Sequence, residues 1–383
     1  MQVSDTHSEV LESARKFIAN EIAPNASLAD AKEEFRLSTF KEMGQLGLLG
    51  LPYPEEYGGV GLGYDVYYQL VREIASACAS TAMSVIAHTS LASGPIFRFG
   101  TEKQKDRHLR PLAAGEKVGA FALTEPNAGS DIGGIELSAE QQGDRYVLNG
   151  SKIFITNANV ADTYIVAART SPGKGMLGIS LFIVERGTPG LRTSGKKEPM
   201  LGMRAADGGE IFFDDVAVPS ENLISRRGLG LKVLHHTLVE ARVGMAALAL
   251  GISEAAQKLC LDYVKQRKQF GKLIYHFQSV GNMLADMTTG VSASELLVSK
   301  AAAGIQEGRD VSLDASIAKL FASEVATRTT KDAIQIFGGY GYSRQYPLER
   351  FFRDAKLTEI GDGTSEIQRM IIIEELVKGR GLS

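Results

Sequence analysis

The sequence predicts an α+β protein of several domains: an N-terminal helical domain, a central antiparallel β-barrel or sandwich, and a C-terminal four-helix bundle. At 383 residues the chain is longer than a single compact core usually organises. Apolar residues recur with the 3.6-residue helical period at both ends of the chain, whereas short β-branched and aromatic runs fill its middle. We therefore expect domains at residues 1–117, 118–228 and 229–383.

The composition excludes several classes of protein. A hydrophobic content of 44% with 23% charged residues is typical of a soluble globular protein, and a net charge of -3 gives no electrostatic reason to bind nucleic acid. No apolar run is long enough for membrane insertion, and the N-terminus lacks a secretory or Arg-rich transit pattern. We expect a cytoplasmic protein with Cys78 and Cys260 as buried thiols; a mitochondrial location would require a transit peptide already removed.

Helices are expected throughout the N-terminal region. Pro24 ends the first of them, and the others are expected at 35–46, 65–92 and 102–112. The segment 65–92 is rich in small residues, which predicts a closely packed core helix.

Strands are expected in the middle region at 145–148, 152–156, 163–168, 179–184 and 210–219. Asn149 and Gly150 lie between the first two runs, and this dipeptide predicts a hairpin turn. Since no helix alternates with these strands, we expect antiparallel pairing.

Four helices are expected in the last region, at 231–266, 278–306, 312–337 and 365–377. The third ends at Gly338 and Gly339, as helix C-termini commonly do. Long helices joined by short turns predict a bundle.

A carboxylate between two glycines precedes the last of these helices. Gly361 and Gly363 allow turn conformations around Asp362, and Thr364 or Ser365 can cap the helix that follows. Local chemistry alone allows two interpretations: an ordinary turn aspartate, or a carboxylate presented to a ligand.

Six segments, in order across all three regions, resemble the acyl-CoA dehydrogenase family. Together they extend over most of the chain without a large insertion between them. The segments are LTEPNAGSD at 123–131, FITN at 154–157, RKQFG at 267–271, FQ at 277–278, QIFGG at 335–339 and GTSEIQR at 363–369.

The resemblance implies FAD as the cofactor, and hydroxyls beside Gly-rich turns suit the polar edge of a flavin. It implies that Arg267 and Gln269 reach the pyrophosphate and adenosine of FAD in a neighbouring subunit, within a homotetramer built as a dimer of dimers. Phe154 stands where the family often has tryptophan. The implied FAD contacts are Phe121, Leu123, Thr124, Gly129, Ser130, Phe154, Ile155, Thr156, Arg267, Gln269, Phe270, Gln278, Gln335, Gly338, Gly339, Thr364 and Glu366.

The resemblance also implies a reaction. Asp362 would remove the α-proton of an acyl-CoA thioester while a hydride passes from the β-carbon to flavin N5, and electron-transferring flavoprotein would accept the electrons. The implied acyl-CoA site contains Ser130, Val239, Arg242 and Gly363.

Two residues on the first bundle helix have alternative roles. Arg242 is either a substrate-pocket residue, as in relatives, or a buried cation paired with a carboxylate. Some branches of the family place their base immediately before this arginine. Here that position is Ala241, and Glu240 lies one residue away, about 100° round the helix, so we disfavour it as the base.

The base position departs from the family. Most members have glutamate where this chain has Asp362, and the loss of one methylene shortens the reach by about 1.5 Å. Members with aspartate here include those acting on alicyclic thioesters, so we expect a cyclic substrate such as cyclohex-1-ene-1-carboxyl-CoA or cyclohexanecarboxyl-CoA. The alternatives are a short- or medium-chain, straight or branched substrate, and a flavin-binding member without dehydrogenase activity: a reductase, a lyase or a binding subunit.

Other chemistries are disfavoured by the sequence. No GxGxxG follows a strand, no His, Cys or carboxylate pair has metal-site spacing, and no GxSxG is present. His88 lies among small residues, where a satisfied core histidine is the default and contact with an acyl chain is the alternative.

Overall fold

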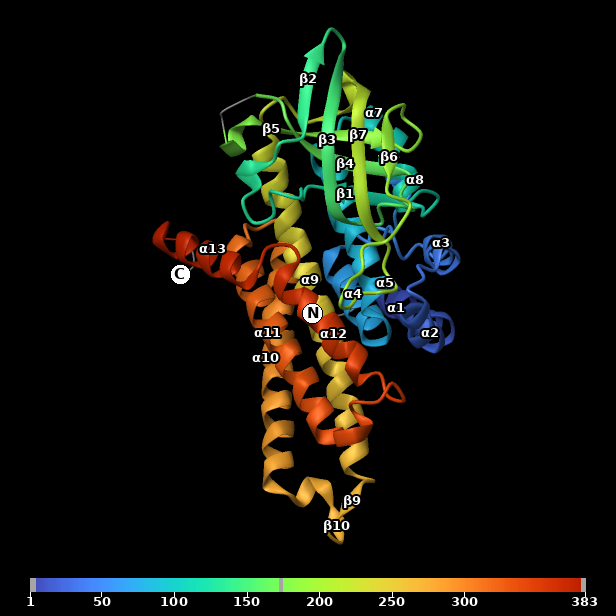
Figure 1. Cartoon of the computed structure of the whole chain (residues 1–383), viewed down its shortest axis with the longest axis vertical. Coiled ribbons are helices and arrows are strands. Elements are labelled where there is room, and N and C mark those ends of the chain that lie inside the picture. Colours follow the sequence, from blue (N-terminus) through green and yellow to red (C-terminus); the bar gives the residue numbers. More distant parts are fainter. Residues whose placement is uncertain (1–4, 172–174, 380–383) are drawn as a thin grey trace.

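A computed structural model describes residues 5–171 and 175–379. The molecule is elongated. A sheet occupies one end, the N-terminal helices pack beside the middle of the molecule, and long C-terminal helices extend to the other end (Figure 1). Within the described ranges, no helix is long and apolar enough to cross a membrane.

The N-terminal region is helical, as predicted, but its longest predicted helix is interrupted. Cys78 takes an extended conformation (φ −151°, ψ 100°) inside the predicted 65–92 helix, and residues Ala87–Ser93 form a π-helical turn. Both cysteines are buried and free, which confirms that prediction. The helices are α1 (Asp5–Phe17), α2 (Ala26–Lys32), α3 (Leu37–Gln45), α4 (Tyr64–Ala77), α5 (Ala79–Ile86), α6 (Gly94–Phe99), α7 (Glu102–Gln104) and α8 (Arg110–Ala113).

The middle region forms an eight-stranded sheet that is mainly, but not wholly, antiparallel. Its order is β6-β7-β3-β2-β4-β5-β8, with β1 beside β4. The pairs β1–β4 and β2–β4 are parallel, which corrects the expected antiparallel pairing. Residues 123–137 leave the sheet after β1, and the chain returns at β2 to pair further along the same strand, β4, in the same direction. The strands are β1 (Gly119–Ala122), β2 (Ser138–Gln142), β3 (Arg145–Thr156), β4 (Thr163–Arg169), β5 (Ile179–Glu185), β6 (Leu191–Thr193), β7 (Gly208–Pro219) and β8 (Leu223–Ile224).

The predicted hairpin at Asn149 and Gly150 is wrong, because β3 continues through both residues. β7 pairs along both halves of β3, with a register shift between Leu148 and Gly150. The Asn149 side chain donates to Asp215 Oδ1 at 3.0 Å and accepts from Asp215 N at 2.8 Å, so this dipeptide forms an irregularity between two long strands.

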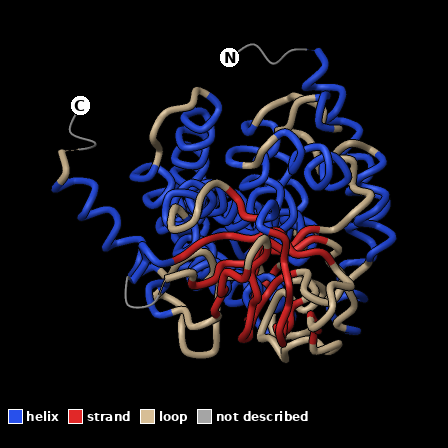
Figure 2. The backbone as a smooth tube through the Cα atoms, turned by 90° about the horizontal axis from the view of Figure 1, so that it is seen from above, coloured by secondary structure: helices blue, strands red, loops and turns tan. Residues whose placement is uncertain are grey.

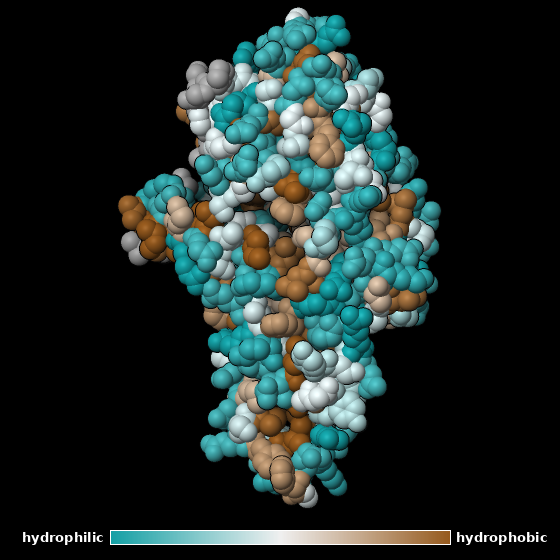
Figure 3. Space-filling view, viewed as in Figure 1, coloured by the Kyte–Doolittle hydropathy of each residue, from teal (hydrophilic) through white to brown (hydrophobic). Residues whose placement is uncertain are grey.

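The bundle consists of α9 to α12, and the helix predicted as its fourth member is a separate arm. Sequence analysis missed α12, which buries Leu348, Phe351 and Ala355 against α9 and α11. Figures 1 and 2 show α13 projecting sideways from the bundle, and Figure 3 shows hydrophobic atoms on this arm. The helices are α9 (Gly230–Val264), α10 (Gln278–Gln306), α11 (Ser312–Phe337), α12 (Leu348–Ile360) and α13 (Ser365–Val377).

Candidate active site

The turn between α12 and α13 presents a carboxylate in a strained conformation. Asp362 has φ +53° and Gly363 has φ +96°, both in the left-handed region. Thr364 caps α13, since its side chain accepts from Ile367 N at 3.3 Å. The Asp362 Oδ2 atom is buried without a hydrogen-bond partner, which disfavours the interpretation of Asp362 as an ordinary turn residue bonded to local backbone.

Two buried cations influence this carboxylate. Burial raises the pKa of Asp362, while the charges of Lys319 and Arg242 lower it. Burial lowers the pKa of Arg242 to about 10, and Asp362 opposes that shift. Arg242 Nε is also buried without a partner, and within the described ranges no carboxylate lies within ion-pair distance of Arg242. Its interpretation as a cation in a structural ion pair is therefore disfavoured, and two unsatisfied polar atoms mark a place for a ligand.

Sequence reasoning missed Lys319. It lies on α11 with a fully buried side chain, and its Nζ donates to Gly363 O at 2.7 Å. Burial lowers its pKa to about 8, although the charge of Asp362 opposes this. The only signal in the sequence is a lysine among small helix residues such as Ala315, Ala318 and Ala322.

Glu240 and His88 both have structural partners. Glu240 is buried, its Oε1 forms an ion pair with Arg98 while its Oε2 has no hydrogen-bond partner, and burial raises its pKa. His88 is fully buried between Leu112 O and Gly119 N, each 3.0 Å from a ring nitrogen. His88 is thus the satisfied core histidine that was expected by default.

The segments predicted to contact the flavin ring lie side by side. Ile153 N, near the end of β3, donates to Thr124 O at 3.0 Å and so joins the 123–131 loop to that strand. Phe154 has φ +59° and is 54% exposed, so its ring face is available to a ligand. Phe121 and Ile155 are buried, so they can offer only backbone groups.

A buried ion pair holds the loop against β3. Lys152 Nζ donates to Glu125 Oε1 at 2.7 Å and to Leu123 O at 2.8 Å. Glu125 also accepts from Glu136 N at 2.6 Å and Leu137 N at 3.0 Å. Burial lowers the pKa of Lys152 to about 8, and Glu125 opposes this.

Four further predicted cofactor residues gather at the far end of the bundle. Arg267, Gln269, Gly338 and Gly339 line an open cavity of about 630 Å³. A Cβ built on either glycine would have nothing within 4 Å, so a ligand could approach the backbone there. Figure 1 places this end, marked by β9 (Lys268–Gln269) and β10 (Lys272–Leu273), opposite the sheet, so one chain does not bring the two groups together.

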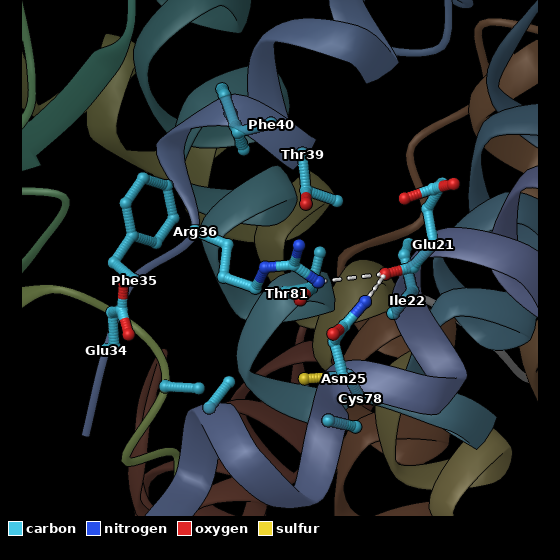
Figure 4. Close-up of a pocket in the computed structure, with 13 residues that line it drawn as sticks. Glu21, Ile22, Asn25, Glu34, Phe35, Arg36, Thr39, Phe40, Cys78 and Thr81 are labelled. Atoms are coloured by element: carbon cyan, nitrogen blue, oxygen red, sulfur yellow. Dashed lines mark hydrogen bonds between the residues drawn. The ribbon is translucent and has the colours of Figure 1, made fainter. Parts of the chain in front are cut away.

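Three other predicted cofactor residues are exposed and do not line this cavity. Phe270 is 93% exposed near the same cavity, and Gln278 and Gln335 are exposed but do not line it. A separate pocket around Arg36 and Cys78 (Figure 4) has about 20 Å³ of free space, room for one water, so it does not extend the site.

The whole sequence resembles known proteins of one family. Family models described as the N-terminal, middle and C-terminal domains of acyl-CoA dehydrogenase match residues 4–116, 120–216 and 228–377. The chain belongs to the acyl-CoA dehydrogenase family. This confirms the predicted fold, and with it the prediction of an oxidoreductase that acts on CH–CH groups with FAD.

Three similar proteins have names that specify a substrate or a flavoprotein. "Acyl-CoA dehydrogenase, short-chain specific" of Clostridium acetobutylicum is 47% identical over 363 residues, 95% of this chain and 96% of that protein. The solved butyryl-CoA dehydrogenase of Megasphaera elsdenii is 45% identical with a TM-score of 0.96, covering 98% of this chain and 99% of its own. A chain in a structure described as "Electron transferring flavoprotein of Acidaminococcus fermentans" is 42% identical, TM-score 0.96, with 99% of both chains covered. None of these three names refers to an alicyclic substrate.

Proposed function

We propose that this protein oxidises short acyl-CoA thioesters to their α,β-unsaturated products, with Asp362 as the base. The observation that carries the proposal is the buried, partnerless Oδ2 of Asp362, close enough to Arg242 and Lys319 for their charges to act on it. A base must be ionised before it can take a proton, and the two cations favour the ionised form.

Each part of the chain then has a task. FAD, when bound, supplies the acceptor for the hydride that leaves the β-carbon. Asp362 takes the α-proton, and its place on a turn fixed in front of α13 holds it in one position. Ser130, Val239, Arg242 and Gly363 are proposed to contact the thioester.

The residues present suit FAD, provided that two chains share each site. Thr124, Phe154 and Thr156 would hold the flavin ring of one copy, and Arg267 and Gln269 of a neighbouring copy would hold the adenosine and pyrophosphate. Since these two groups of residues lie at opposite ends of the folded molecule, we propose a homotetramer that shares its cofactors between subunits. Exposed Met370, Ile373 and Val377 on α13 are apolar enough for a subunit contact. We propose electron-transferring flavoprotein as the acceptor.

Short straight-chain thioesters are the first proposed substrates, because two of the relatives described above carry short-chain substrates in their names: a short-chain specific acyl-CoA dehydrogenase and a butyryl-CoA dehydrogenase. The test is an anaerobic titration of the purified protein with butyryl-, octanoyl-, cyclohexanecarboxyl- and cyclohex-1-ene-1-carboxyl-CoA. Flavin bleaching by butyryl-CoA at the lowest concentration is expected. Failure of all four to bleach the flavin would contradict dehydrogenation.

Alicyclic thioesters are the second candidate, and the short side chain of the base favours them. Asp362 has a shorter reach than the glutamate usual in the family. Gly361 has φ −62° and ψ 152°, an extended conformation that does not require glycine, and a Cβ there would lie 3.2 Å from Met245 Cε. A side chain at position 361 would therefore press on Met245, because 3.2 Å is closer than an ordinary Cβ contact.

A larger side chain at position 361 is expected to act on ring substrates first, because it crowds Met245 next to the turn that carries Asp362. Gly361→Leu should lower kcat/KM for cyclohexanecarboxyl-CoA about 10- to 100-fold, because overpacking beside a bulky ring costs about 1–3 kcal/mol. Butyryl-CoA should be affected several-fold less. Steady-state kinetics with both thioesters measures the ratio, and an equal loss for the two would contradict a role for Gly361 in selectivity.

A further inference from the structure

A lysine is buried where the predicted chemistry has no obvious use for it. Lys319 is fully buried on α11, and burying an ammonium group is costly unless it is paired. Gly363 O, at 2.7 Å, is its hydrogen-bond acceptor, and no carboxylate of the described residues lies within ion-pair distance of it. The effect of Lys319 on the turn between α12 and α13 therefore has to explain why the lysine is buried there.

The carbonyl that Lys319 contacts already has another donor. Gln368 Nε2 donates to Gly363 O at 2.8 Å and approaches Asp362 O at 3.3 Å. A neutral side chain thus satisfies this backbone without the lysine. What Lys319 adds is a second tie and a positive charge.

That charge acts on the carboxylate. The groups whose charges act on Lys319 come from each surrounding element: Asp362 from the turn, Arg242 from α9, Glu359 from α12 and Glu366 from α13. Among them, Asp362 has the largest effect. Two cations lower the pKa of Asp362 against the effect of burial, and Lys319 has the larger effect of the two.

We propose that Lys319 is a positioning residue for proton abstraction: it fixes the turn that carries Asp362 and places a positive charge near its carboxylate. The proposal rests on the proposed function, in which the α-carbon–hydrogen bond breaks and the proton passes to Asp362. The backbone tie matters more for an aspartate than for a glutamate, because a short side chain cannot compensate for a displaced turn.

The test compares Lys319→Met with Gln368→Met in the flavin-loaded enzyme. Both variants remove one donor to the same carbonyl, but only the first removes a charge. Stopped-flow flavin reduction by butyryl-CoA is measured against pH. Lys319→Met should slow the limiting rate of reduction about a hundredfold at neutral pH, with the Kd for butyryl-CoA changed less than about threefold. Its acidic limb should move to higher pH by about one unit, since the cation that stabilised the carboxylate is gone. In Gln368→Met the acidic limb should stay in place, and Lys319→Arg should restore it.

A second readout does not depend on turnover. Hydrogen exchange of peptides covering residues 357–369 should be faster in Lys319→Met than in the parent protein, because the turn has lost a tie. If no acyl-CoA reduces the parent flavin, the proposed function fails, and this measurement still tests the tie.

Three results would overturn the proposal. One is an acidic limb that does not move in Lys319→Met, and another is an equal shift in Gln368→Met. The third is failure of both Lys319→Met and Lys319→Gln to fold with flavin bound, which would make the lysine a structural residue.

Discussion

Replacement of Asp362 by asparagine is expected to slow flavin reduction by acyl-CoA about 10²- to 10⁴-fold while flavin stays bound. Asparagine has nearly the same size and can occupy the same turn, but it cannot accept the α-proton. Anaerobic mixing with butyryl-CoA, followed by flavin absorbance, measures the rate, and the ratio of visible to ultraviolet absorbance measures bound flavin.

A matched variant separates Asp362 from the other buried carboxylate near it. Glu240→Gln removes a carboxylate that is already engaged by Arg98. Glu240→Gln should therefore keep far more activity than Asp362→Asn. Bleaching at the parent rate in Asp362→Asn, with a large loss in Glu240→Gln, would move the base to Glu240.

Lys152→Met is expected to lower the free energy of unfolding by about 3–5 kcal/mol, because it leaves Glu125 as an unpaired charge in a buried place. The Lys152 side chain is fully buried and that of Glu125 is 5% exposed. Flavin should also be lost more readily, since the pair ties the 123–131 loop to β3. Denaturation followed by flavin fluorescence measures both effects.

An exposed pair provides the control for this prediction. Lys103 and Glu221 are 2.6 Å apart, with side chains 72% and 49% exposed, so Lys103→Met should have little effect on the free energy of unfolding. The double variant Glu125→Gln with Lys152→Met should recover part of the loss. Equal costs for Lys152→Met and Lys103→Met would show that burial adds nothing to the first pair.

Local sequence patterns predicted the helical and sheet regions, and ordered motifs predicted the family. They failed where distant segments decide the outcome. Asn149 and Gly150 have the chemistry of a turn, yet pairing with β7 on both sides keeps β3 continuous. The case of α12 is different: Leu348, Phe351 and Ala355 have helical spacing after Pro347, so that helix was open to prediction and was overlooked.

The candidate site shows the same division. Asp362 could be proposed as a site residue only through the ordered family motifs, because the glycines and the helix cap around it also suit an ordinary turn aspartate. Lys319 could not, because its partner is 44 residues away on another element and an isolated lysine in a helix usually faces water. The separation of Arg267 from Phe154 also depends on the whole length of the bundle, which no motif encodes.

The backbone of Asp362 has a consequence for laboratory evolution. A non-glycine residue at φ +53° costs about 1–3 kcal/mol, and glycine would relieve this strain and also remove a buried carboxylate. Selection of this enzyme for heat resistance alone should therefore favour glycine at position 362, and the selected variants would be more stable proteins that lack the proposed base. Any such screen needs catalytic turnover as a second criterion.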